Sequence, residues 1–207
     1  MNDETTGLRN NDQTPENPFV LFNEWLNLAV DAEPNDPSAM SIASVDSEGM
    51  PNVRIVLMRR FDERGFCFFT NFESQKGEEL LASKKAAAVF HWKSLRKQIR
   101  IRGEVEPVRE AEADEYFNSR PRGSQIASSA SKQSQPLPDR KEFEDAMKAL
   151  EAKYEGQDVP RPTHWSGFRI MPLSIEFWDD GEFRTHDRLR FDREKLGDAW
   201  ETLRLYP

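Results

Sequence analysis

Between residues 39 and 108 the chain repeats one pattern, in which a short apolar run is followed by a tight turn. Ser47-Glu48-Gly49 and Asp62-Glu63-Arg64-Gly65 have the composition of such turns. Gly103 interrupts the last run and predicts a β-bulge. Consecutive strands joined by short turns favour an antiparallel sheet or a barrel over a parallel α/β sheet. The strands are expected at 39–46, 52–61, 66–71, 86–92 and 98–108.

Helices are expected around this sheet. Asn17-Pro18 has the form of an N-cap followed by proline at the first helical position, and an aromatic stripe that includes Trp25 follows at helical spacing. The predicted fold is a small β-barrel with peripheral helices, made by residues 17–207 as one domain after a flexible polar tail of residues 1–16. Further helices are expected at 74–83, 110–118, 124–129 and 139–154, and further strands at 167–170, 173–178, 183–191 and 199–204.

Charge and cysteine content narrow the class of protein. The 207 residues carry a formal net charge of −8, whereas general nucleic-acid binders are usually basic. A phosphate ligand would therefore need a local cluster of Arg and Lys. Cys67 is the single cysteine and lies in an apolar run, so it is expected to be a buried side chain in a protein of the reducing cytoplasm. The three histidines are far apart, without the spacing of a metal site, and no membrane span is expected.

The segment Ile175–Arg188 concentrates a tryptophan, a histidine and two arginines in a short stretch. Residues 183–191 have the pattern of a strand, and alternate residues of a strand share one face. Arg184, His186 and Arg188 are therefore expected on one side, where they could hold an anion and hydrogen-bond a planar heteroaromatic ring. A solvated strand face that carries charge is an equally good explanation from the pattern alone.

The run from Arg54 to Arg59 is an apolar strand with an arginine at each end. This pattern indicates anion binding at the ends of the strand, although two ordinary surface arginines would look the same. Residues five apart point to opposite faces of a regular strand. Either the strand is distorted near Arg59, or the two arginines serve different sites across a dimer.

Two further segments offer donors to a phosphate group. Residues 69–77 end a strand and open a helix, where free backbone N–H groups and Lys76 would favour an anion. Tyr116, Arg120 and Ser124 follow at a spacing of four and give three donors suited to one phosphate, although Pro121 breaks a continuous helix. A plain capped helix and a helix end with a proline turn are the simpler explanations.

These segments together resemble the pyridoxamine 5′-phosphate oxidase family. The C-terminal segment is similar to the family signature Glu-Phe-Trp, five residues, then Arg-aliphatic-His-Asp-Arg, with Thr185 at the aliphatic position. The other segments resemble the family's motifs with Arg59 in place of lysine and Gln75 in place of arginine. The resemblance covers roughly residues 17–207. It implies a split β-barrel of the FMN-binding type that works as a homodimer, with its sites at the subunit interface.

The resemblance also implies roles for individual residues. Substrate-binding residues would be Arg59, Tyr116, Arg120, Ser124, Arg184 and His186, of which Arg184 and His186 would lie over the reacting carbon and be catalytic. Residues at the FMN cofactor would be Arg54, Ile55, Val56, Leu57, Met58, Arg59, Phe69, Thr70, Gln75, Lys76, Gln98, Gln133, Ser134, Trp178 and Arg188.

The implied reaction is the oxidation of pyridoxamine 5′-phosphate or pyridoxine 5′-phosphate to pyridoxal 5′-phosphate, with oxygen as acceptor and hydrogen peroxide as second product. Three alternatives stay open. One is a related flavin oxidase for another substrate, such as a phenazine precursor, and another is a non-enzymatic module that binds flavin or pyridoxal phosphate. A small nucleic-acid-binding barrel is the most distant. Tyr116, Arg120 and Ser124 favour a phosphorylated substrate.

Overall fold

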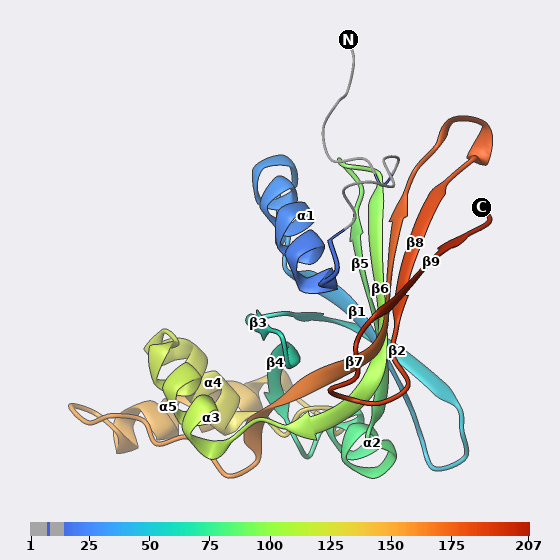
Figure 1. The fold of residues 1–207 in the computed structure, drawn as a ribbon. Coiled ribbons are helices and arrows are strands. Elements are labelled where there is room, and N and C mark those ends of the chain that lie inside the picture. The colour runs from blue at the N-terminus through green and yellow to red at the C-terminus, as the bar shows by residue number, and fades with distance from the viewer. Residues whose placement is uncertain (1–7, 9–14) are drawn as a thin grey trace.

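The computed structural model describes Leu8 and residues 15–207. The polar tail predicted for residues 1–16 therefore lies largely outside the described residues. The expectation of a mainly β fold is confirmed, because nine strands of the described residues form one curled antiparallel sheet with helices beside it (Figure 1). No helix in this described part of the chain has both the length and the apolar composition needed to cross a bilayer.

The strands follow the predicted succession closely. Their order in the sheet is β2-β1-β5-β6-β7-β4-β3, with β8 paired to β7 and β9 paired to β8. Their bounds are β1 Ala39–Val45, β2 Pro51–Leu57, β3 Arg60–Asp62, β4 Gly65–Asn71, β5 Lys85–Trp92, β6 Lys97–Pro107, β7 Trp165–Asp179, β8 Asp187–Asp192 and β9 Glu201–Leu205.

The long strand β7 gives the sheet its split form. Its first half, from Trp165 to Ile170, pairs with β4, and its second half, from Ser174 to Asp179, pairs with β8. Strand β6 accompanies β7 along both halves on the other side. The sheet therefore opens into two arms, one ending at β4 and β3 and the other at β8 and β9 (Figure 1).

Side chains cap the starts of three described helices. Asn17, an expected cap, accepts a hydrogen bond from the backbone of Phe19, Ser74 caps the second helix, and Asp139 caps the fifth. Helices α3, α4 and α5 gather beside the β4 arm, and α1 lies across the other part of the sheet (Figure 1). Their bounds are α1 Pro18–Ala32, α2 Gln75–Ser83, α3 Glu110–Ser119, α4 Arg122–Ala130 and α5 Arg140–Lys153, with a short 3-10 helix, η2, at Glu182–Arg184.

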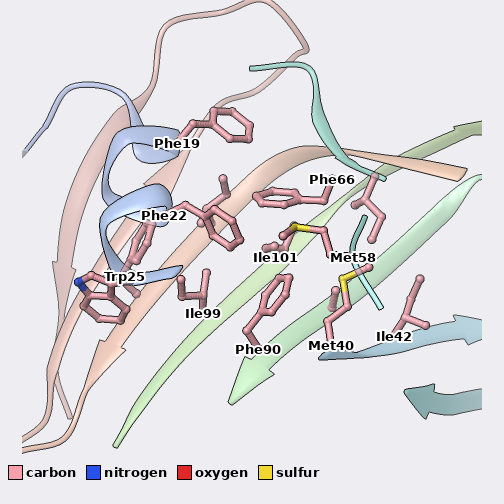
Figure 2. Close-up of a cluster of buried hydrophobic side chains, with 14 of the residues drawn as sticks. Phe19, Phe22, Trp25, Met40, Ile42, Met58, Phe66, Phe90, Ile99 and Ile101 are labelled. Atoms are coloured by element: carbon pink, nitrogen blue, oxygen red, sulfur yellow. The ribbon is translucent and has the colours of Figure 1, made fainter. Parts of the chain in front are cut away.

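The main core lies between α1 and the sheet (Figure 2). Phe22 and Trp25 are fully buried, and the ring of Phe22 packs edge-on against Phe66 and Phe90 at 4.8 and 5.3 Å between centroids. The aromatic stripe of α1 is therefore core, as predicted, and each such side chain contributes about 1.5–3 kcal/mol through burial. Cys67 is also buried, and burial raises the pKa of its thiol to about 11, which removes it as a nucleophile at neutral pH.

Four predicted strands are divided, merged or shortened in the structure. The segment 52–61 is two strands, because the chain leaves β2 after Leu57 and β3 pairs with β4 instead of β1. The segments 167–170 and 173–178 belong to the single strand β7. The segment 183–191 becomes a strand only at Asp187, since the preceding residues form η2. The bulge predicted at Gly103 is confirmed by a register shift between Arg102 and Gly103.

Candidate active site

A pocket of about 710 Å³ lies where β2 and β4 meet the helices α3 and α4. Eleven of the predicted site residues line this pocket. They are Ile55, Val56, Leu57, Arg59, Phe69, Thr70, Lys76, Tyr116, Arg120, Ser124 and Gln133.

The pocket is cationic, although the chain as a whole is acidic. Arg59, Lys76 and Arg120 line it, and no aspartate or glutamate is among its described lining residues. Within the part of the chain that the structure describes, these three side chains form no ion pair with a carboxylate, unlike Arg54 with Glu79. Uncompensated charge of this kind attracts an anion, and it does so most strongly where burial reduces screening.

Lys76 is held at one side of the pocket by neutral oxygen atoms. Its Nζ donates to Oε1 of Gln133 at 2.7 Å and to Oγ of Ser74 at 3.0 Å. The hydroxyl of Thr70 also donates to Oε1 of Gln133, at 3.2 Å. Burial, followed by the nearby charge of Arg54, lowers the pKa of Lys76 to about 8. The ammonium group is therefore present at neutral pH but would be stabilised by an added anion.

Stacked aromatic rings form another wall of the pocket. Phe69 and Tyr116 stack at 4.1 Å between centroids, and Trp165 continues the stack at 5.6 Å from Phe69. The guanidinium group of Arg120 lies over Trp165 at 4.9 Å and donates to the hydroxyl of Ser128 at 2.7 Å. Burial lowers the pKa of Arg120, and the charge of Arg59 lowers it further, so both cations face one space.

The chain direction changes at Arg59, which is one of the two alternatives left open by the spacing of Arg54 and Arg59. The backbone N–H of Arg59 donates to the carbonyl of Cys67 at 2.8 Å, and β3 begins at the next residue. Arg59 therefore reaches the pocket. Arg54 lies behind the wall, where it donates to Ser44 at 2.6 Å and pairs with Glu79 at 3.2 Å. Met58 is part of the core rather than of the pocket.

The other predicted residues lie along the second arm of the sheet. Gln98, Trp178 and Arg188 are direct cross-strand partners on β6, β7 and β8, so their side chains form a row on one face. Trp165 in the pocket and Trp178 in this row are separated by roughly 40 Å of strand, at about 3.3 Å per residue. Gln75 and Ser134 are exposed and do not line the pocket.

The row carries charged and aromatic side chains in fixed positions. Arg188 pairs with Glu176 at 2.7 Å, and the buried Glu176 also accepts from Arg100 at 3.0 Å. The imidazole of His186 lies against Trp178, with 4.5 Å between ring centroids. Arg184 does not share a strand face with His186 and Arg188, contrary to the sequence prediction. It lies in η2 with a positive φ of 65° and is exposed at the loop tip beside Phe183.

Some lining residues had no role in the sequence interpretation. Trp165 is the clearest, because it supports Arg120 and yet lies at the start of a strand without any surrounding motif. Ser128 lies four residues after Ser124, and this continued spacing was a usable signal. Asn71 and Ser131 also line the pocket, and Asn71 Nδ2 donates to the carbonyl of Ser131 at 3.2 Å.

The fold and the pocket define a split-barrel protein with a cationic pocket that has an aromatic wall. The chain belongs to the pyridoxamine 5′-phosphate oxidase family. A family model described as pyridoxamine 5′-phosphate oxidase matches residues 26–154. A second model, described as the pyridoxine 5′-phosphate oxidase C-terminal dimerisation region, matches residues 165–207.

Individual relatives agree with this family. The chain is 58% identical over 203 residues to a pyridoxine/pyridoxamine 5′-phosphate oxidase of Agrobacterium fabrum, covering 98% of both chains. It is 56% identical to the protein of the same name from Allorhizobium ampelinum, covering 100% of this chain and 99% of that one. Among solved structures, PhzG from Burkholderia lata in complex with tetrahydrophenazine-1-carboxylic acid has a TM-score of 0.90 and 33% identity, covering 98% of both chains.

Proposed function

We propose that this protein is an FMN-dependent oxidase that converts pyridoxamine 5′-phosphate or pyridoxine 5′-phosphate to pyridoxal 5′-phosphate, with oxygen as acceptor and hydrogen peroxide as second product. Its role would be in the salvage or synthesis of vitamin B6. The observation that carries the proposal is the pocket of Arg59, Lys76 and Arg120, which has an aromatic wall and no described carboxylate. Relatives named for this activity at 56–58% identity support it.

The pocket has the size and the chemistry that FMN requires. Its volume of about 710 Å³ lies within the range of cofactor sites, about 300–1,000 Å³. Lys76, Thr70 and Gln133 would hold the phosphate end, with the backbone at the start of α2 adding N–H donors. The strand residues 55–57 would lie along the flavin. Arg54 is behind the wall and would act on the phosphate through its charge near Lys76.

The substrate phosphate would bind at the opposite side of the same pocket. Arg120, Tyr116 and Ser124 line that side, and Arg59 faces it from the end of β2. Arginine binds phosphate in a bidentate manner, so Arg59 would retain the function of the lysine that is usual there, with altered geometry. The ring stack of Phe69, Tyr116 and Trp165 keeps these donors in place.

A homodimer would bring the two groups of site residues together. The row that contains Gln98, Trp178 and Arg188 is too far along β7 to share a ligand with the pocket of its own chain. Trp178 and Arg188 of this row belong to the segment that matches the family's dimerisation region. Strand β2 is at an edge of the sheet, and its exposed residues Val53 and Ile55 give an apolar surface for a second subunit.

Catalysis by this arrangement would depend on positioning. Bound FMN would supply the hydride acceptor and the route by which electrons reach oxygen. Arg120, Tyr116 and Ser124 would fix the substrate by its phosphate, and Arg184 and His186 of the other subunit would orient the reacting end. The exposed position of Arg184 in the single chain suits a residue that meets its ligand across an interface. No covalent enzyme intermediate is required.

One alternative substrate class has an observation in its favour. PhzG, whose structure is similar, was solved with tetrahydrophenazine-1-carboxylic acid, which carries a carboxylate rather than a phosphate. Four donors line this side of the pocket, and they favour a phosphate because a phosphate offers more acceptor oxygens than a carboxylate.

The chain would also be cytoplasmic, consistent with its single buried cysteine.

The proposal is tested by mixing the FMN-loaded protein with each substrate in the absence of air. Pyridoxamine 5′-phosphate is expected to bleach the visible flavin absorbance, and tetrahydrophenazine-1-carboxylic acid is not. Bleaching by the second compound alone would replace the proposed substrate. Bleaching by neither, with flavin still bound, would favour a binding module without this activity.

A further inference from the structure

Asp180 occupies the root of the loop that joins β7 to β8. This loop projects at the far end of the second arm (Figure 1). One oxygen of the Asp180 carboxylate, Oδ1, lies 2.9 Å from Nδ1 of His186, and the other, Oδ2, contacts the guanidinium group of Arg96. The side chains of Asp180 and His186 are only 12% and 19% exposed, so water competes weakly for this contact.

Two groups compete for Nδ1 of His186. The carboxylate of Asp180 can only accept a hydrogen bond, whereas the backbone N–H of Gly181, 3.3 Å away, can only donate one. The two contacts therefore require opposite tautomers of a neutral imidazole. A hydrogen bond to a charged group is stronger than one between neutral groups. The shorter contact, to the charged carboxylate of Asp180, is therefore the stronger one and determines the tautomer. The proton lies on Nδ1.

We propose that Asp180 is a positioning residue that holds His186 in the tautomer with its proton on Nδ1. This inference rests on the proposed function for the role of His186. Nε2 is then an acceptor, and within residues 8 and 15–207 it has no hydrogen-bond partner. It is free to accept from an N–H or O–H group at the reacting end of the substrate. The ring of Trp178, 4.5 Å away, fixes the plane of the imidazole.

Arg96 makes the orientation of Asp180 specific. It lies in the turn between β5 and β6, and its carbonyl also accepts from the backbone N–H of Asp180 at 3.2 Å. The neighbouring ion pair of Lys97 and Asp179, at 2.7 Å, ties the same ends of β6 and β7 together. The guanidinium group of Arg96 can only donate hydrogen bonds, so it favours an oxygen atom of residue 180 on its side.

This arrangement predicts an unusual effect of Asp180→Asn. The amide would turn its oxygen to Arg96 and its NH₂ group to His186, because an NH₂ group facing Arg96 would place two donors together. Nδ1 would then become an acceptor, and the proton would move to Nε2. Removing Arg96 as well, in the double variant with Arg96→Ala, frees the amide to turn its oxygen back to His186.

The test is ¹⁵N–¹H NMR of the histidine side chains in the full chain reconstituted with FMN, at a pH at which histidine is neutral. Three histidines give signals, and His186→Gln assigns the relevant one. The wild type and Asp192→Asn, a matched control on β8 whose carboxylate pairs with Arg190, are expected to have the proton on Nδ1. Asp180→Asn is expected to move it to Nε2, and the double variant to restore it in part.

Kinetics on the same proteins separate this inference from the proposed function. Asp180→Asn is expected to lower kcat/KM for pyridoxamine 5′-phosphate by about tenfold or more with FMN affinity unchanged, and the double variant to recover part of that loss. An Nε2–H tautomer in the wild type, an unchanged tautomer in Asp180→Asn, or a changed tautomer with unchanged kcat/KM would overturn the inference. An inactive wild type with the expected tautomers would overturn the proposed function and leave the pairing of Asp180 with His186 standing.

Discussion

Lys76 and Gln133 are 57 positions apart in the sequence, and Nζ of the lysine lies 2.7 Å from Oε1 of the glutamine. This contact joins the first turn of α2 to the loop that follows α4. Both residues were expected at the flavin from their motifs alone, and the fold brings them to one side of the pocket. Among the described residues the lysine has only neutral hydrogen-bond partners, so the pH dependence of its charge can be observed through ligand binding.

FMN affinity is expected to fall as the pH rises through about 8, the pKa of Lys76 in the free protein. A bound phosphate favours the protonated lysine, so binding takes up a proton above that pH and weakens by up to about tenfold per pH unit. Fluorescence titration between pH 7 and about 9 measures this. Lys76→Arg keeps its charge and should give a flat profile, and a flat profile for the wild type would contradict the assignment.

Arg120→Ala is expected to reduce kcat/KM for pyridoxamine 5′-phosphate by roughly 10- to 100-fold, which corresponds to about 1.5–3 kcal/mol for a charged hydrogen bond. FMN affinity should change little, because Lys76 lies on the other side of the pocket. Arg122→Ala is the matched control, since Arg122 is bound to Glu151 and to the carbonyls of Tyr154 and Gln157. Equal losses in both variants would remove the specific role of Arg120.

Mixing two inactive variants is expected to restore activity. In a dimer whose sites combine the pocket of one chain with the loop of the other, Arg120→Ala and Arg184→Ala damage different halves of each site. A mixed dimer has one intact site, so an equal mixture after subunit exchange should recover about a quarter of wild-type activity. Two different affinity tags confirm that mixed dimers form. Mixed dimers without activity would show that each site is made by one chain.

Glu112 is expected to stabilise the fold in a pH-dependent manner. Burial opposes its ionisation, but hydrogen bonds from Arg109 and the charge of Arg169 hold the pKa of Glu112 at about 2. This stabilisation is present above the ordinary pKa of 4.5 and is lost as the pH falls toward about 2.

Glu112→Gln should therefore lower the free energy of unfolding by about 1–3 kcal/mol near pH 7, because Arg169 is buried beside it, and by less near pH 3. Urea unfolding at both pH values tests this. Glu115→Gln, on the exposed side of the same helix, should have little effect at either pH. A loss in Glu112→Gln that does not depend on pH would contradict the assigned ion pair.

Short sequence motifs predicted the structure correctly where neighbouring residues determine it. Asn17-Pro18 begins α1, Ser74 caps α2, and Gly103 marks a bulge, each as predicted. At Gly103 the reason is close approach, since an added Cβ would lie 2.1 Å from the carbonyl oxygen of Met171. The same bulge explains why Pro172 does not end β7, because proline is tolerated where the ladder is already disrupted.

The loop before β8 could not be predicted from alternation. Arg184, His186 and Arg188 recur at every second position as on one face of a strand. Phe183 and Arg184, however, both adopt positive φ angles, of 56° and 65°. Gly181 was the available signal, because a Cβ there would lie 2.1 Å from the carbonyl oxygen of Thr185, which closes the turn. Trp165 had no signal at all, since its contact with Arg120 depends on how β7 passes the helices.

We propose that the cationic pocket serves the oxidation of a phosphorylated B6 vitamer. The most direct measurement is to mix the purified protein with FMN and pyridoxamine 5′-phosphate in air, and to follow pyridoxal 5′-phosphate and hydrogen peroxide together. We expect both products to appear in equal amounts and at a rate proportional to the protein concentration. Absence of both products, in a protein shown to bind FMN, would contradict the proposed oxidase activity.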